Sequence, residues 1–238
     1  MVKTLLAQWM LLLVLFSASL ANAGWLDDLL EKIEPLAGQG QGDMVAGLKE
    51  ALSVGAGNAV AAVGRADGYF GNEAIRILMP EKIQTVADTL GKLGYRKPVD
   101  DFVLSMNRAA EQAAPQAKAH FIDAVREMSF DDAKSVFEGG DTAATEYLKG
   151  KTYDKIFSAF MPIVSNRLDA VGGTRYYKEM IAKFEAIPFM SAENLDLNRY
   201  VTSRALDGLF LMIAEEEKKI RTDPAARVTD LLKKVFGS

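Results

Sequence analysis

The chain has 238 residues, of which 49% are apolar and 25% charged, values typical of one large globular domain or two small ones. Its 28 Lys and Arg against 32 Asp and Glu give a net charge of −4, which argues against binding to duplex nucleic acid because that requires a basic surface. Cysteine is absent and His120 is the only histidine, which excludes disulfides, thiol catalysis and multi-histidine metal sites.

The first 23 residues have the features of a secretory signal peptide. Lys3 supplies the positive start, residues 5–16 are apolar except for Gln8, and Ala21-Asn22-Ala23 is a small-x-small cleavage site. A transmembrane anchor is the alternative, but a membrane span needs about 20 apolar residues and this run is shorter. We therefore expect cleavage after Ala23, a periplasmic or secreted protein, and no transmembrane segment after signal removal.

Residues 24–42 are predicted to form a short amphipathic helix and a flexible tether. Trp25 to Leu36 carries apolar residues at helical spacing, together with four acidic residues against one lysine. That acidity disfavours contact with an anionic lipid surface. The stretch Gly38-Gln39-Gly40-Gln41-Gly42 breaks the helix. A single helical domain is then expected over 43–238.

From Asp43, which suits an N-cap, apolar residues recur at intervals of three and four, as they do in helices. Ala51, Gly55 and Ala59 lie four residues apart and would let another helix approach closely. Helices are expected at 43–63, 81–93, 98–113, 115–128 and 129–139, from 141 or 142, and at 156–171, 174–187, 196–221 and from 223.

Two features interrupt this helical pattern. Residues 64–72 are rich in turn-forming residues, and 74–79 is a short apolar run that could be extended or form a lone strand. Pro162 should bend the helix at 156–171, and the helix at 196–221 is expected to be the longest. The sequence predicts an all-α fold: an irregular multi-helix bundle with Pro-kinked helices around a central helix in the C-terminal half, with at most one short strand pair.

Three stretches resemble a bacterial family of exported proteins known as domain of unknown function 4197. They are DGYFGNEAIRILMP (67–80), SMNRAAEQAAPQAKAHF (105–121) and VTSRALDGLFLMIAEEEKKIRTDPAARVTDLLKKVFG (201–237), and the likeness runs from about Leu48 to the C-terminus. The resemblance implies a signal peptide and an all-helical domain. It implies no activity and no catalytic or binding residues.

The run Ala205 to Ala214 is apolar except for Gly208 and Asp207, which predicts a buried helix containing one carboxylate. Such a carboxylate has to be paired or protonated. The arginines available are Arg204 on the same helix, Arg76 within an apolar run, and Arg108. We expect Asp207 to meet at least one of them inside the domain, either as a structural ion pair or as a site for an anion or polar ligand.

Other polar groups have plainer interpretations. Asn107, Arg108 and Glu111 share one helix and form either a solvated face or an inter-helix polar network. His120, Asp123 and Glu127 are spaced as metal ligands could be, but we interpret them as a solvated face and expect no metal. The charged stretch 215–221, with i,i+4 pairs such as Glu217 and Arg221, is interpreted as a solvated half of its helix.

No catalytic constellation is present, and 10 Met and 12 Phe supply adaptable apolar surface or simply fill the core. We interpret the chain as an exported, soluble, non-enzymatic binding or structural protein of the cell envelope. One alternative is a carrier of a lipid or other apolar ligand in an inter-helix cavity. Another is an enzyme with a carboxylate/arginine site. The sequence predicts no cofactor and no nucleic acid partner, and leaves open whether the partner is an apolar ligand or an envelope protein.

Overall fold

The computed structural model describes residues 39–170, 172–189, 195–227, 229 and 233. The predicted signal peptide and the predicted helix at 25–36 lie outside these residues, as does most of the helix expected after Asp223. The chain divides into a main compact unit, Asp43–Ser238, and a second unit, Met1–Gly42.

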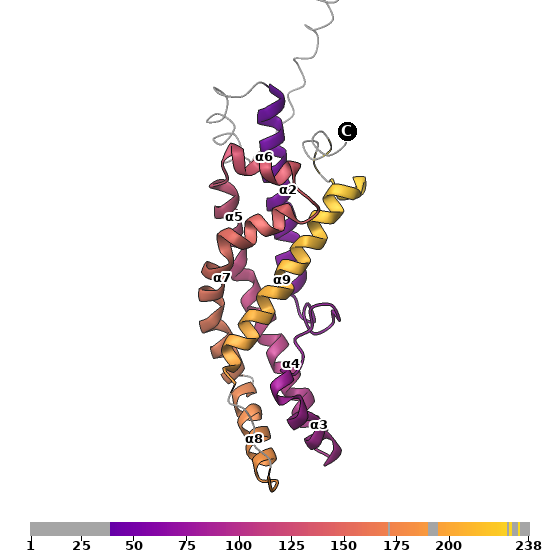
Figure 1. The fold of residues 1–238 in the computed structure, drawn as a ribbon, viewed down its shortest axis with the longest axis vertical. Coiled ribbons are helices and arrows are strands. Elements are labelled where there is room, and N and C mark those ends of the chain that lie inside the picture. Colours follow the sequence, from indigo (N-terminus) through magenta and orange to yellow (C-terminus); the bar gives the residue numbers. More distant parts are fainter. Residues whose placement is uncertain (1–38, 171, 190–194, 228, 230–232, 234–238) are drawn as a thin grey trace, which may run out of the picture. The chain divides into compact units, whose positions relative to one another are not determined.

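The described residues are all-α and contain no strand, which confirms the predicted fold class (Figure 1). The run 74–79 forms turns and irregular backbone rather than a strand. No helix in the described part of the chain has the length and hydropathy needed to cross a bilayer.

The elements are α2 (Gln39–Gly64), η1 (Glu81–Ile83), α3 (Gln84–Lys92), α4 (Arg96–Ala113), η2 (Ala114–Gln116), α5 (Ala117–Arg126), α6 (Phe130–Glu138), α7 (Ala143–Ala170), α8 (Gly173–Glu185), α9 (Leu197–Thr222) and η3 (Pro224–Ala226).

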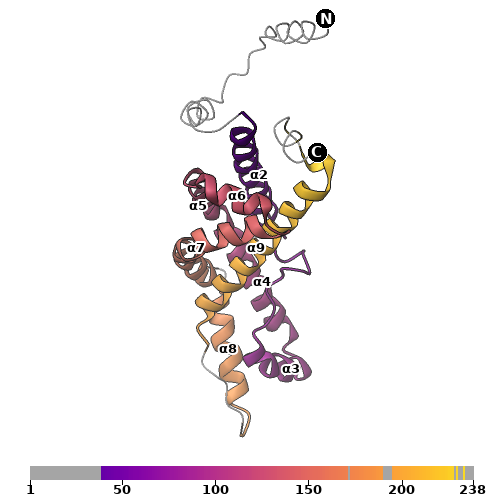
Figure 2. The same ribbon diagram turned by 45° about the horizontal axis from the view of Figure 1, so that its top comes forward.

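Helices α7 and α9 cross at the centre of the bundle, and both also pack against α4 (Figures 1 and 2). Val201, Ala205 and Leu209 are among the buried residues of α9. Helix α7 has 28 residues and α9 has 26, so the expectation that α9 is the longest helix was wrong. The core therefore forms around two long helices instead of one.

Helix α7 is one helix, where the sequence predicted two, one from 141 or 142 and one at 156–171, and it continues through Pro162. Proline inside a helix removes one hydrogen bond and costs about 3 kcal/mol. Ile156, Phe160, Val164 and Leu168 are fully buried on one face of this helix. Burying a side chain of this size contributes roughly 1.5–3 kcal/mol, so the packing of this face offsets the cost of the proline.

Two helices, α6 and α9, begin next to the residues at which the sequence placed their starts, and each has a side-chain cap. Ser129 forms a capping box with Asp132 at the start of α6, and the backbone and hydroxyl hydrogen bonds from Ser129 lower the pKa of Asp132. Asp196 caps α9 by accepting from the N–H of Arg199. At α8 the N-cap is Gly172, with φ of +77°, so this helix begins at Gly173, one residue before the start expected at 174.

Helix α2 begins at Gln39, which corrects two predictions. Residues 39–42, expected to belong to the tether, are helical, and Asp43 is not an N-cap. Glycine in a helix costs only about 1 kcal/mol relative to alanine, so a helix fixed by packing further along can extend through it.

The small residues of α2 allow the close helix approach that the sequence predicted. A Cβ on Gly55 would lie 3.5 Å from Cδ1 of Ile220 and 3.6 Å from Cβ of Glu216, both on α9. Asn58 adds a hydrogen bond of 3.1 Å from its amide to the Glu216 carboxylate. The second half of α9 is therefore covered by α2.

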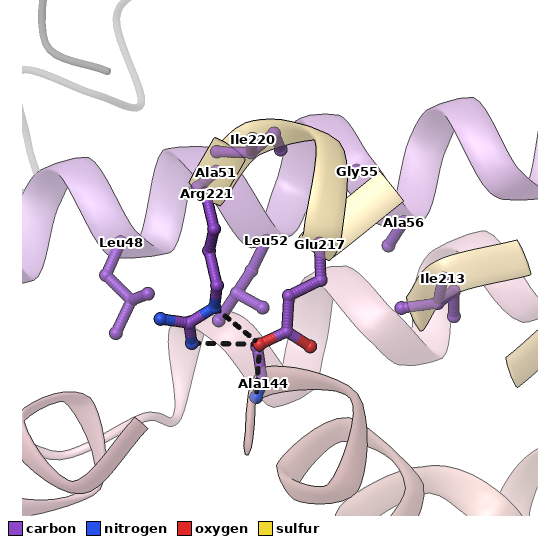
Figure 3. A pocket seen from close by; sticks show the side chains of 10 residues that line it. All are labelled: Leu48, Ala51, Leu52, Gly55, Ala56, Ala144, Ile213, Glu217, Ile220 and Arg221. Carbon is purple, nitrogen blue, oxygen red and sulfur yellow. Dashed lines mark hydrogen bonds and ion pairs between the residues drawn. The ribbon is translucent and has the colours of Figure 1, made fainter. Parts of the chain in front are cut away.

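Because of this cover, Glu217 is buried and Arg221 is mostly buried (Figure 3). The prediction of a solvated half-helix was wrong for these two residues, whereas Glu215, Lys218 and Lys219 are exposed as expected. One carboxylate oxygen of Glu217 accepts from the N–H of Ala144 at 3.0 Å, and the other accepts from the N–H and hydroxyl of Thr145 at 2.9 and 2.7 Å. Arg221 donates to Glu217 at 2.8 and 3.0 Å and to the carbonyl of Val136 at 3.0 Å. One ion pair thus joins α9 to the end of α6 and the first turn of α7.

Replacing Glu217 by alanine should lower the free energy of unfolding by about 3–5 kcal/mol. The change removes the acceptor for the first turn of α7 and leaves the Arg221 guanidinium buried without its carboxylate. Urea denaturation measures the effect. Glu215→Ala, an identical change at an exposed position of the same helix, is the control and should stay within about 0.5 kcal/mol of wild type. Equal stability of the two variants would contradict the role of Glu217.

Candidate functional site

Residues 65–80, which we name the connection, link α2 to η1 without a helix or strand of their own. Most connections inside a compact domain are shorter, and loops beyond about 12–15 residues are usually functional or disordered. This connection is held at several points by buried groups of α4 and α9. An ordered loop of this length is therefore a candidate functional segment.

Glu111 of α4 holds the first part of the connection. Its side chain is nearly buried, and one carboxylate oxygen accepts from the N–H groups of Tyr69 and Phe70, each at 3.2 Å. The other oxygen accepts from Arg108 at 2.6 Å, and this hydrogen bond raises the pKa of Arg108. Arg108 also donates to Asp67 at 2.7 Å. The carboxylate can be buried because every contact to it comes from a donor.

Asn107 holds the second part, four residues earlier on the same helix. Its side chain is fully buried and pairs with Ile77 in both directions. The amide oxygen accepts from the N–H of Ile77 at 2.9 Å, and the amide nitrogen donates to the carbonyl of Ile77 at 2.8 Å. A second amide hydrogen reaches the carbonyl of Val103, also at 2.8 Å. The Asn107 amide thus takes the place that the backbone of a neighbouring strand would have, and it fixes the backbone of Ile77.

Tyr69 fastens the connection to α9. Its ring is fully buried, and its hydroxyl donates to the carbonyl of Ala205 at 2.6 Å. Burial raises the pKa of this phenol, so it stays a donor. Arg76 closes the loop on itself, since its Nε donates to the carbonyl of Phe70 at 2.5 Å and its guanidinium lies 4.3 Å from the centre of the Phe70 ring.

A groove of about 460 Å³ runs between the connection and one face of α9. We name it the groove; it is lined by residues 73–79, 81 and 84 on one side and by Tyr200, Arg204, Asp207, Gly208 and Leu211 on the other. Its volume falls within the range of ligand sites in proteins, about 300–1,000 Å³. Two exposed leucines line it, Leu78 at 61% and Leu211 at 43% exposure.

The prediction that Asp207 is buried was wrong. Its side chain is 53% exposed, and its contact is with Arg204, equally exposed, at 3.8 Å. Tyr200, Arg204, Asp207 and Leu211 are spaced by four, three and four residues, so they lie on one face of α9, and that face lines the groove. Because this face is open, α9 is not buried all round as its composition suggested.

The six residues singled out in the sequence divide into two groups. Asn107, Arg108 and Glu111 form a polar network between α4 and the connection that carries Arg76, so the network joins a helix to a loop and not one helix to another. Arg76, Arg204 and Asp207 line the groove. Sequence reasoning missed Tyr69, Tyr200, Leu78 and Leu211. The one available signal was the stripe of Tyr200, Arg204, Asp207 and Leu211 at helical spacing.

The floor of the groove depends on Gly208. A Cβ at this position would lie 2.8 Å from Cε1 of Tyr69 and 3.0 Å from Cβ of Ile75. Contacts this short require a buried ring or the connection to move, and such overpacking costs about 1–3 kcal/mol.

Gly208→Ala should therefore lower the melting temperature, even though alanine is the better helix former by about 1 kcal/mol. The matched control is Gly57→Ala in α2, where an added Cβ meets nothing within 4 Å. That variant should melt higher than wild type, as expected from about 0.5–1 kcal/mol of helix propensity. Thermal unfolding followed by circular dichroism measures both melting temperatures. A rise in the melting temperature of both variants would show that the connection does not pack tightly against Gly208 of α9.

Comparison with known proteins gives one match. The model of the family described as Protein of unknown function (DUF4197) matches residues 38–237, which include the three stretches on which the resemblance was based. No curated protein and no solved structure matches significantly. The chain therefore belongs to the DUF4197 family of proteins of unknown function.

Proposed function

We propose that the protein is a non-enzymatic binding protein of the cell envelope, and that its groove binds a short extended segment of a partner polypeptide. The observation that carries this proposal is Leu78. Its side chain is 61% exposed at the groove, while the backbone beside it is fixed by the buried amide of Asn107 at Ile77. A fixed backbone that presents an apolar side chain to solvent is arranged for recognition, because little conformational entropy is lost on binding.

The chemistry of the groove supports a polypeptide as the ligand. Leu78 and Leu211 offer apolar contact, Arg76 and Arg204 offer guanidinium groups, and Asp207 offers a carboxylate. A peptide carries apolar side chains, charges of both signs and its own backbone donors and acceptors, so it complements such a mixed surface.

The two alternative functions have less support. The apolar hollow between α2 and α9 beside Glu217 has a volume of about 30 Å³, which is room for about one water molecule and not for a lipid chain (Figure 3). A larger hollow of about 860 Å³ near α8 has a mixed lining, in which charged residues such as Asp169 and Lys178 stand beside apolar residues such as Ile181, so it is not the apolar cavity that a lipid chain needs. For an enzyme, the buried carboxylates Glu111 and Glu217 are poorly placed, because both oxygens of each accept from protein donors.

The proposed site of action depends on export. Expression in a bacterium, followed by cell fractionation and intact-mass measurement of the protein, tests the signal peptide. We expect a mature chain that starts at Gly24 and leaves the cytoplasm. A protein that keeps residues 1–23 and stays in the cytoplasmic fraction would contradict the envelope assignment without bearing on the groove.

Peptide binding can be tested with an array of ten-residue peptides, followed by fluorescence polarisation of the strongest binders in solution. Leu78→Glu should weaken binding at least about tenfold, because it places a charge at the apolar contact. Leu93→Glu is the matched control, since Leu93 is 59% exposed and lies outside the groove. Binding equal to wild type in Leu78→Glu, or no peptide bound at all, would refute the proposal.

A further inference from the structure

In the described part of the chain, all the large apolar side chains that remain exposed, except Phe130 at the start of α6, lie at two places. Leu78 and Leu211 line the groove, whereas Leu93, Tyr95 and Phe189 lie in the turns that follow α3 and α8. Leu93 is 59% exposed, Tyr95 40%, and Phe189 fully. Exposed apolar side chains that cluster indicate a contact surface, whereas single ones need no explanation.

The two turns belong to one end of the bundle. Helices α3 and α8 pack against each other and end at the same end of the bundle in both views (Figures 1 and 2). Lys183, in the last turn of α8, lies with its ammonium 4.4 Å from the centre of the Tyr95 ring. We name the surface formed by residues 92–97 and 183–189 the tip.

The backbone of the tip holds its apolar side chains outward. Gly94 has a φ of +87°, a conformation that glycine adopts freely, and it makes the sharp turn that leaves Leu93 and Tyr95 exposed. Phe189 has a φ of +66°, which is unusual for a bulky residue. Ile187, two residues earlier, packs against the core. Phe189 is thus presented to solvent by a strained turn next to an anchored residue.

The charge of the tip is opposite to that of the whole chain. Residues 92–97 and 183–189 contain Lys92, Arg96, Lys97 and Lys183 but a single acidic residue, Glu185, while the full chain has a net charge of −4. Asp100 and Asp101 lie further along α4 and pair with Arg96 at 3.6 Å and Lys97 at 2.7 Å. Lys92 and Lys183 thus remain as basic groups outside these two ion pairs, next to Leu93 in sequence and over the Tyr95 ring respectively.

We propose that the tip binds the surface of a bilayer that contains anionic phospholipid. Leu93, Tyr95 and Phe189 enter the headgroup region, where aromatic and apolar side chains are favoured, and Lys92 and Lys183, which lie outside the ion pairs with Asp100 and Asp101, contact lipid phosphates. The bundle is thereby held at the membrane by a peripheral contact. The groove shares no residue with the tip, so this proposal is independent of the proposed peptide binding.

Co-sedimentation with unilamellar vesicles tests it. The purified protein should bind mixed phosphatidylethanolamine–phosphatidylglycerol vesicles, bind phosphatidylcholine vesicles less, and dissociate as salt is raised. Phe189→Asp and Leu93→Asp should each weaken binding about tenfold, as expected from losing an apolar contact of roughly this size. Leu78→Asp, at a comparably exposed leucine of the groove, should bind vesicles as wild type does.

A second measurement reports insertion directly. In a variant that combines Phe189→Trp with Trp25→Phe, the emission of the new tryptophan should shift to the blue when anionic vesicles are added. The proposal is overturned if the protein binds neither kind of vesicle, or if Phe189→Asp binds anionic vesicles as wild type does. It is also overturned if sedimentation velocity shows a dimer that Phe189→Asp abolishes, because the tip would then be an interface between copies of the chain.

Discussion

Backbone N–H groups at helix ends and in ordered loops need acceptors once they are removed from water, and here three buried side chains supply them. Asn107 and Glu111 of α4 accept from the connection, and Glu217 of α9 accepts from the first turn of α7. Both carboxylates are balanced by an arginine, Arg108 or Arg221. The placement of the connection and the junction of α7 with α9 both depend on these pairs, because a buried carboxylate without its donors would be strongly unfavourable.

The fixed connection leaves apolar side chains exposed at the groove. Since Ile77 is held on α4 and Tyr69 on α9, the backbone between them cannot collapse into the space beside α9. The groove therefore persists with Leu78 and Leu211 exposed at its walls. At the end of the bundle, the tip exposes other apolar side chains among basic groups. The two proposals assign these surfaces to different partners: a polypeptide segment at the groove and an anionic bilayer at the tip.

Much of the fold could be predicted because helix formation is decided by neighbouring residues. The caps at Ser129 and Asp196 and the close-packing stripe around Gly55 each depend on residues within one or two turns. Predictions failed where distant packing outweighed a local signal. The sequence predicted two helices over 141–171, yet α7 is a single helix that continues through Pro162, because its buried face packs on both sides of the proline.

The candidate site was predicted only in part, for the same reason. Asp207 and Glu217 both lie on α9 with an arginine one turn away. The sequence predicted a buried Asp207 and a solvated Glu217, and the structure shows the reverse. The sequence alone determined the all-α fold class, the cap at Ser129 and the family, since these follow from periodicity and short motifs. Only the tertiary structure decided which face of α9 is covered. That depends on where α2 and the connection lie, and residues distant in the chain set their positions.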